Sequence, residues 1–253
     1  MEFKVLASGS KGNSSFVTCG TTSFLIDIGI TYHRLLRELD RMGVCLSDVS
    51  FLLLTHTHRD HISGLSVLLK HSQFRVYIRE EMYPELKDIL PLDRIEFYQD
   101  EMHLNDITLN LIHTSHDAPG SVGFLFTYLE HSLVYITDTG YLNRKYLKLL
   151  KNKEIYYMES NHDEKMLMDG PYPYVLKQRI LSDVGHLSNE TTSEYLQELV
   201  GKDTKYVVLA HLSEHNNTEE LAYSTTFNKL KETEYHPVLL VAKQEEASEL
   251  LEV

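Results

Sequence analysis

Short apolar segments that each run into a histidine or an acidic residue constrain this sequence more than any other feature. Five such ends are present: His56, His116, Asp138, Glu159 and His211 follow the segments 51–55, 107–115, 133–137, 155–158 and 206–210. Strands that pack in one core bring such ends to a common rim, where loops build binding sites. A single histidine after a strand is usually an ordinary surface residue, but this repeated pattern predicts one shared site.

The rest of the chain alternates between apolar runs of strand length and helical patterns, which is typical of layered α/β proteins. The expected strands are 3–7, 15–19, 23–28, 49–54, 75–78, 107–112, 122–128, 133–137, 155–158, 206–210 and 237–241. The expected helices are 32–42, 60–71, 143–151, 174–181, 189–200 and 218–231. No linker rich in Gly, Pro or Ser interrupts the chain, so we expect residues 1–253 to form one domain.

The composition is that of a globular protein that can bury its own core, with 42% hydrophobic and 24% charged residues. Cys19 and Cys45 do not make a disulfide framework, so we expect reduced thiols. The apolar run at the start is too short for a signal peptide, and no stretch reaches the roughly 18 apolar residues of a membrane span. These features predict a cytoplasmic protein.

The densest cluster of ligand-type side chains is the run from His56 to His61. In an extended turn, His56 and His58 point to the same side and can reach one ion. Asp60 and His61 open the next helix and point towards a second ion. Imidazole suits zinc and iron, and a carboxylate adds manganese to the choice. A loop of solvated histidines is the alternative, and the position directly after a buried strand argues against it.

Two metal ions need further ligands, and His116, Asp138 and His211 are the natural completion. A carboxylate such as Asp138 can bridge two cations and hold them about 3.5–4 Å apart. His113 is the rival for His116, but strand alternation predicts that it is packed or faces solvent. A water between two such ions ionises near neutral pH, and the resulting hydroxide would attack phosphorus. The cations would stabilise the charge that develops on a phosphoryl oxygen.

A departing alkoxide needs a proton, and His186 lies immediately before an expected helix N-terminus, where backbone N–H groups favour phosphate. We expect His186 to contact phosphate and act as the general acid, tuned or oriented by Glu159. A histidine that merely packs at a helix start, and a glutamate that only orients a ligand, are the alternatives. Asp60, a ligand of the second ion, is counted among the catalytic residues as well.

Three further features stay open at the level of sequence. Asp27 ends an apolar strand and either orients a ligand histidine or starts a turn. The glycine-containing segment 8–14 either cradles phosphate or lines a cleft, or else it forms a hairpin loop. Tyr172 and Tyr174 are more often packing residues than platforms for bases.

The run His56-Thr57-His58-Arg59-Asp60-His61 resembles the HxHxDH signature of the metallo-β-lactamase superfamily, and His116, Asp138 and His211 follow in the expected order. The resemblance implies an αββα sandwich with a dinuclear site at one edge of the two sheets. The sequence is most similar to the YycJ/WalJ family, over nearly the whole chain. The matching segments are 7–13, 115–118, 137–140, 159–163, 185–189 and 210–213. That similarity implies a 5′→3′ exonuclease that acts on DNA and has a role in repair.

The order Glu159, His186, His211 also resembles the tRNA 3′-processing endonucleases of the superfamily, which implies that His186 is a proton donor. The sequence has no long inserted β-CASP domain and no evident flexible arm for tRNA. The expected cofactors are therefore two divalent ions (Zn, Mn or Fe), and the expected partner is DNA, with RNA and small phosphodiesters as alternatives.

A formal net charge of −13 argues against a broad basic surface for nucleic acid. Two bound divalent cations would add about four positive charges at one spot and so leave a DNA substrate open. The acidic composition favours a competing hypothesis, hydrolysis of small phosphodiesters such as cyclic nucleotides. Thioester or β-lactam hydrolysis would leave Glu159 and His186 without a purpose. A non-catalytic, metal-bound module that acts through partners is the remaining alternative.

Overall fold

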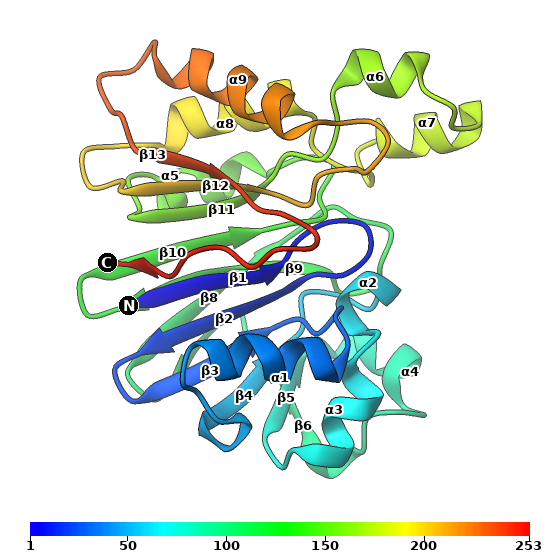
Figure 1. Cartoon of the computed structure of the whole chain (residues 1–253), viewed down its shortest axis with the longest axis vertical. Coiled ribbons are helices and arrows are strands. Elements are labelled where there is room, and N and C mark those ends of the chain that lie inside the picture. The colour runs from blue at the N-terminus through cyan, green and yellow to red at the C-terminus, as the bar shows by residue number, and fades with distance from the viewer.

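The computed structural model describes all residues, 1–253, as two facing sheets with helices on their outer sides (Figure 1). Each sheet has seven strands, in the orders β14-β1-β2-β3-β4-β5-β6 and β13-β12-β11-β10-β9-β8-β7. Each sheet is mixed, with one parallel part and one antiparallel part. The expected αββα sandwich is confirmed.

The first sheet contains the N-terminal strands and closes with the C-terminal one. Its strands are β1 (Glu2–Ala7), β2 (Ser14–Cys19), β3 (Thr22–Ile26), β4 (Val49–Leu53), β5 (Arg75–Ile78), β6 (Ile95–Phe97) and β14 (Leu251–Glu252). Strands β3 to β6 are parallel, so their carboxyl ends share one edge. The two termini lie side by side, since the Met1 amino group donates to the Val253 carbonyl at 2.7 Å (Figure 1).

The second sheet contains the middle of the chain. Its strands are β7 (Glu101–Leu104), β8 (Ile107–His113), β9 (Val122–Tyr128), β10 (His131–Ile136), β11 (Ile155–Glu159), β12 (Tyr206–Ala210) and β13 (Val238–Val241). Strands β10 to β13 are parallel. Their carboxyl ends also meet at one edge, and there the two sheets bring their following loops together.

The helices form the two outer layers (Figure 1). They are α1 (Tyr32–Arg41), α2 (Arg59–Ile62), α3 (Leu65–His71), α4 (Tyr83–Leu86), α5 (Leu147–Leu150), α6 (Glu164–Asp169), α7 (Tyr174–Ile180), α8 (Asn189–Leu199) and α9 (Glu219–Leu230). Short 3₁₀ turns lie at Leu46–Asp48, Glu80–Met82, Leu92–Arg94 and Arg144–Tyr146. Helices α1 and α3 cover the first sheet, whereas α5, α8 and α9 cover the second. None of them is long and apolar enough to cross a membrane.

The main core fills the space between the sheets. The strands alternate large apolar side chains into it, and the rings of Tyr135 and Tyr157 stack there with centroids 4.2 Å apart. The Tyr157 hydroxyl bonds to Ser8 Oγ at 2.9 Å, and Ser8 Oγ in turn accepts from the His211 N–H at 2.8 Å. The packed core therefore reaches directly to the backbone of one of the strand-end residues.

The prediction of one helix over 60–71 is wrong, because the chain breaks at Gly64 into α2 and α3. The Gly64 N–H donates to the Ile28 carbonyl, and a Cβ at Gly64 would meet the Ile30 carbonyl oxygen at 2.2 Å. The close approach of this backbone to the 28–30 turn ends the first helix. The sequence pattern also did not predict β6, β7, β14, α4 and α6, which are all short.

Candidate metal centre

The loop after β4 and the start of α2 supply the N-terminal side of the site. His56 and His61 are fully buried, while the His58 side chain is 35% exposed and Asp60 is partly buried. Thr57 points the other way and donates to the carboxylate of Glu85 on α4. The alternation along 56–58 thus turns both histidines inward and fixes the residue between them to the neighbouring helix.

The second sheet supplies His116, Asp138 and His211, each from a different loop. Asp138 follows β10 and His211 follows β12, and both adopt left-handed backbone conformations, with φ of 53° and 55°. Asp27, at the end of β3, does the same with φ of 58°. Non-glycine residues rarely hold this conformation, and it clusters where a site requires a particular side-chain direction. The strands end in a sharp turn that aims each side chain at the common rim.

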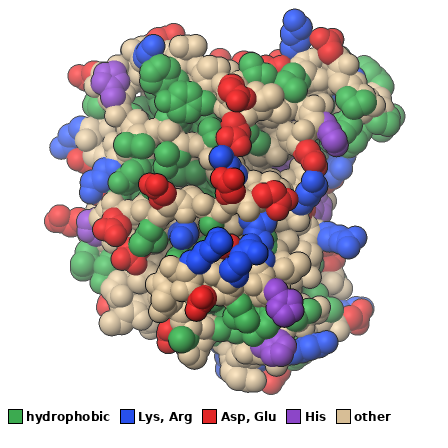
Figure 2. All heavy atoms as spheres, in the orientation of Figure 1, with side chains coloured by type: hydrophobic (Ala, Val, Ile, Leu, Met, Phe, Trp, Pro, Cys, Tyr) green, Lys and Arg blue, Asp and Glu red, His purple; other side chains and the backbone are tan.

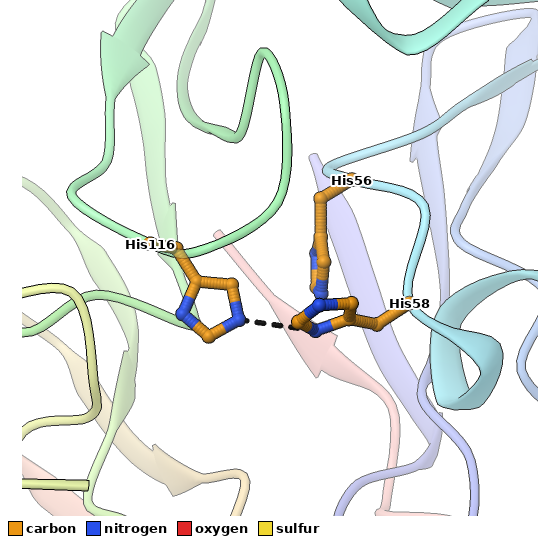
Figure 3. A group of neighbouring side chains, drawn as sticks. All are labelled: His56, His58 and His116. Carbon is orange, nitrogen blue, oxygen red and sulfur yellow. Dashed lines mark hydrogen bonds between the residues drawn. The ribbon is translucent and has the colours of Figure 1, made fainter. Parts of the chain in front are cut away.

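One group of converging nitrogens comes from His56, His58 and His116, all within 4.8 Å of one another (Figure 3). His116 Nε2 lies 3.1 Å from His58 Nδ1, and His56 Nε2 is buried without any hydrogen-bond partner. An unpaired buried nitrogen costs free energy unless something binds it. Three imidazoles around one point are the donor set that zinc and similar ions prefer, so these residues fit a metal ion.

A second group comes from Asp60, His61 and His211, again within 4.8 Å. Asp138 lies between the two groups. Its Oδ2 is 3.2 Å from His61 Nε2 and its Oδ1 is 3.7 Å from His116 Nε2. A carboxylate at this position can contact an ion in each group.

The Nδ1 atoms of His56, His61 and His116 are each engaged in a hydrogen bond outside the cluster, which leaves their Nε2 atoms to face its centre. His61 Nδ1 donates to Asp27 Oδ2 at 2.7 Å and His116 Nδ1 to the Gly185 carbonyl at 3.2 Å. Thr55 Oγ1 donates to Asp27, so it accepts from His56 Nδ1 at 3.1 Å. Outer hydrogen bonds of this kind fix the tautomer and ring orientation of metal-binding histidines.

The charges of the cluster suit divalent cations. Burial by itself would lower the pKa of His61, but the carboxylates of Asp27, Asp138 and Asp60 raise it to about 10. Burial opposes charge on His211 as well, yet Asp138, Asp60 and Glu159 raise its pKa well above the ordinary value. Protons on these imidazoles therefore supply the positive charge that the carboxylates require, and divalent ions would replace those protons.

His56 differs from these two. Burial and the neighbouring His61 lower the pKa of His56 well below its ordinary value, so its ring is neutral. A neutral imidazole with a free Nε2 lone pair is ready to bind a metal ion.

Glu159 and His186 sit beside the second group. Glu159 Oε1 accepts from His186 Nδ1 at 2.7 Å and from His211 Nδ1 at 2.9 Å, and its Oε2 accepts from the Thr139 and Leu187 N–H groups. Glu159 and His186 also lie close enough to Asp138 and His211 to share an ion with them. Because four donors already occupy both oxygens of the buried Glu159, we interpret it as an orienting residue.

A cleft of about 260 Å³ opens over the cluster. Its lining residues are Ser10, His58, Asp60, Asp138, Asn161, Tyr172, Leu176, Arg179, Ile180, His186, His211 and Ser213. On the face drawn in Figure 2, acidic and basic side chains are interspersed.

Several site residues lay outside the sequence predictions. Asn13 donates from its Nδ2 to Asp60 Oδ2 at 3.2 Å, and Arg179 pairs with Asp117 Oδ2 at 2.6 Å. Tyr172 lines the cleft, although the sequence favoured packing for it. The segment 8–14 joins the antiparallel strands β1 and β2 as a hairpin loop, and its Ser10 lines the cleft. Nothing in the sequence of this loop singled out Asn13 as a partner of Asp60.

His113 lies outside the cluster, where its Nε2 bonds to Asp100 Oδ1 at 2.9 Å on the surface. The preference for His116 over His113 agrees with this geometry. Asp27 also lies where one of its two readings put it, against a ring nitrogen of His61.

Comparison with known proteins now gives the family. The family model of the beta-lactamase superfamily domain matches residues 22–212. The chain is 33% identical over 240 residues to exodeoxyribonuclease WalJ of Streptococcus pneumoniae, covering 92% of this chain and 89% of the relative. It is 35% identical over 237 residues to exodeoxyribonuclease YycJ of Bacillus anthracis, covering 92% and 90%.

Solved structures agree on the fold. YhfI of Bacillus subtilis, a metallo-beta-lactamase fold protein, superposes with a TM-score of 0.72 at 16% identity, covering 98% of this chain and 99% of the other. Zn²⁺-bound PqqB of Methylobacterium extorquens superposes with a TM-score of 0.73 at 12% identity, covering 98% and 100%. With the histidine and aspartate cluster in place, these matches show that the chain belongs to the metallo-β-lactamase superfamily as a metal-dependent hydrolase of the WalJ/YycJ exodeoxyribonuclease family.

Proposed function

We propose that this protein is a dinuclear-metal-dependent phosphodiesterase that removes nucleotides from the end of a DNA strand, in the 5′→3′ direction. The Glu159–His186 pair beside the metal groups carries the proposal. A hydrolase of an activated bond needs no proton donor of this kind, whereas an alkoxide leaving from phosphorus does. Two relatives of nearly full-length overlap are named exodeoxyribonucleases, which supports DNA as the substrate.

Each residue has a defined task in this proposal. One cation would be held by His56, His58 and His116 and the other by Asp60, His61 and His211, with Asp138 placed between the two groups. When bound, the cations lower the pKa of water and stabilise negative charge on phosphoryl oxygens. Asp27 and Glu159 keep His61 and His211 in the orientation that binding requires.

His186 acts on the leaving group. Its Nδ1–H donates a hydrogen bond to Glu159 Oε1, which directs Nε2 away from that carboxylate. The side chain is 17% exposed and lines the cleft, so substrate can reach it. His186 Nε2–H would donate to the phosphate oxygen and then pass its proton to the leaving 3′ oxygen, while the Glu159 carboxylate stabilises the charged ring until then.

The test loads the protein with manganese or zinc and offers 5′- and 3′-labelled duplex DNA, single-stranded DNA and RNA. The proposal expects mononucleotides from the 5′ end of DNA and no turnover after chelation. Products from the 3′ end would overturn the polarity, and internal cuts would overturn the exonuclease assignment. Faster hydrolysis of RNA would overturn the DNA assignment.

One observation favours a second substrate class. The cleft of about 260 Å³ is small, and the net charge of −13 disfavours long polyanions outside it. A cyclic nucleotide is small enough for this cleft and carries only one negative charge. Hydrolysis of cyclic nucleotides without any activity on DNA would select this alternative. The intact cluster and the family membership set aside the non-catalytic alternative.

A further inference from the structure

One side of the cleft comes from an element that supplies no candidate ligand. The segment 164–180, here called the arm, contains α6, a turn and α7, and it projects beyond α8 and α9 at the upper right of Figure 1. Four of its side chains line the cleft: Tyr172, Leu176, Arg179 and Ile180. The arm thus adds an aromatic ring and two aliphatic side chains to a site whose other residues are polar or charged.

Two features restrict the turn that carries Tyr172. Pro171 and Pro173 flank it and restrict the backbone on both sides. Lys177 is 9% exposed, and its Nζ donates to the Met168 carbonyl at 2.6 Å and to the Gly170 carbonyl at 2.8 Å. A buried ammonium that closes a turn of the chain limits the backbone conformations around Tyr172, and such preorganisation lowers the entropy cost of binding.

The arm is also tied to the loops that carry candidate ligands. Arg179 pairs with Asp117, the residue after His116, with an Nε–Oδ2 distance of 2.6 Å. The Tyr172 ring meets the ring of His215 edge to face, with centroids 5.9 Å apart, in the loop that begins at His211. These contacts place Tyr172 beside the loops that carry the candidate ligands.

We propose that the arm binds the terminal nucleotide of the substrate strand in an unpaired state, with its base stacked on Tyr172 and the scissile diester at the metal centre. This inference rests on the function proposed above. Every base has a π-face, and stacking on an aromatic side chain is the usual way to hold it without sequence preference. A stacked base carries no charge, so it also suits an acidic protein with one Lys or Arg, Arg179, in the cleft.

The size of the cleft favours an unpaired nucleotide. Its volume of about 260 Å³ lies just below the usual range of small-molecule sites, so it suits a single nucleotide better than a base pair. A base cannot pair with the opposite strand and enter the cleft at once. Unpairing costs least for single-stranded and mismatched ends, so the protein would prefer those ends over blunt, fully paired ones.

The test deletes the ring and the base, singly and together. Tyr172→Ala is compared with the unchanged protein on two single-stranded DNAs, one with an ordinary terminal nucleotide and one with an abasic terminal nucleotide. We expect each deletion alone to raise KM about tenfold or more, and the double deletion to add little, because both remove the same contact. Anisotropy with DNA whose terminal linkage resists hydrolysis should give the same pattern in Kd.

Two control variants separate stacking from folding. Tyr172→Phe keeps the ring and should retain the ordinary KM. Tyr174→Ala removes a tyrosine that is 68% exposed, on the same arm but outside the cleft lining, and should change nothing.

Additive losses, or unchanged KM in Tyr172→Ala while DNA is still degraded, would overturn the stacking inference and leave the exonuclease proposal standing. Equal rates on mismatched and blunt ends would overturn the unpaired state. Absence of turnover on every DNA by the unchanged, metal-loaded protein would overturn the proposed function itself.

Discussion

The two sheets supply the candidate metal centre in different ways. The first sheet delivers its four ligand-type residues in one run, from His56 to His61, after a single strand. The second sheet delivers His116, Asp138 and His211 from three separate loops. A compact run is a local property of the sequence, whereas the scattered residues meet only when the strand order of the whole sheet is correct. The geometry of the second sheet is therefore the more demanding part of the site.

The largest expected effect comes from the residue between the two groups. Asp138→Ala removes the carboxylate that contacts both, so we expect turnover to disappear and metal content to fall below two ions per chain. Metal analysis and DNA hydrolysis measure the two results. Asp100→Ala, at a surface carboxylate bonded to His113, is the control and should behave like the unchanged protein. An Asp138→Ala protein that keeps two ions and full activity would contradict the claim that the second sheet supplies the more demanding part of the site.

His186→Ala removes the partner of Glu159, the last residue of β11 in the second sheet, and leaves every proposed metal ligand unchanged. We expect kcat to fall by about 10²–10⁴-fold with metal content unchanged, because a general acid is lost and the ions stay in place. Loss of an ion from this variant would instead make His186 a ligand, which its distance to Asp138 permits. His113→Ala, on the neighbouring surface, is the matched histidine control.

Asp27→Asn tests the support of the compact run. The amide keeps the shape of the side chain but weakens the hydrogen bond to His61 Nδ1, so we expect metal affinity to drop about 10–100-fold. Competition with a chromogenic chelator measures this loss, and the ion held by Asp60, His61 and His211 should leave first. Simultaneous loss of both ions would mean that the two groups are not separable.

The smallest effect is expected at Glu154, just before β11, the strand whose last residue is Glu159. Burial would raise the pKa of Glu154, but hydrogen bonds from Lys205 and His131 outweigh it and lower the pKa below its ordinary value. Glu154→Gln should cost on the order of 1 kcal/mol of unfolding free energy at neutral pH and leave activity unchanged. Glu159→Gln, at the other end of the strand, should instead reduce kcat.

The pH dependence of that cost has a definite sign. A carboxylate with a lowered pKa in the folded state stabilises the protein fully above its unfolded pKa of about 4.3 and loses this contribution as the pH falls through the folded pKa. The stabilities of the Glu154→Gln and unchanged proteins in denaturant unfolding should therefore begin to converge below the unfolded pKa of about 4.3 and meet once the pH lies below the folded pKa. A difference that persists into acid would mean that the charge of Glu154 is not what stabilises the fold.

The same contrast explains what the sequence could predict. Apolar runs with a ligand-type residue at the end were enough to bring His116, Asp138, Glu159 and His211 to one rim, because carboxyl ends of parallel strands share an edge. Short elements such as β6 and α4 were missed, since three or four residues give too little periodicity. The break at Gly64 depends on a tertiary approach to the 28–30 turn, which no local pattern records. Tyr172 lines the cleft because of where the whole arm packs, and this tertiary position is not encoded in the residues next to it.

The most direct measurement of the central claim is anomalous diffraction from crystals grown with manganese or zinc. The account predicts two ions, one among His56, His58 and His116 and one among Asp60, His61 and His211, with Asp138 touching both. A single ion, or ions held by the Glu159 carboxylate, would contradict it.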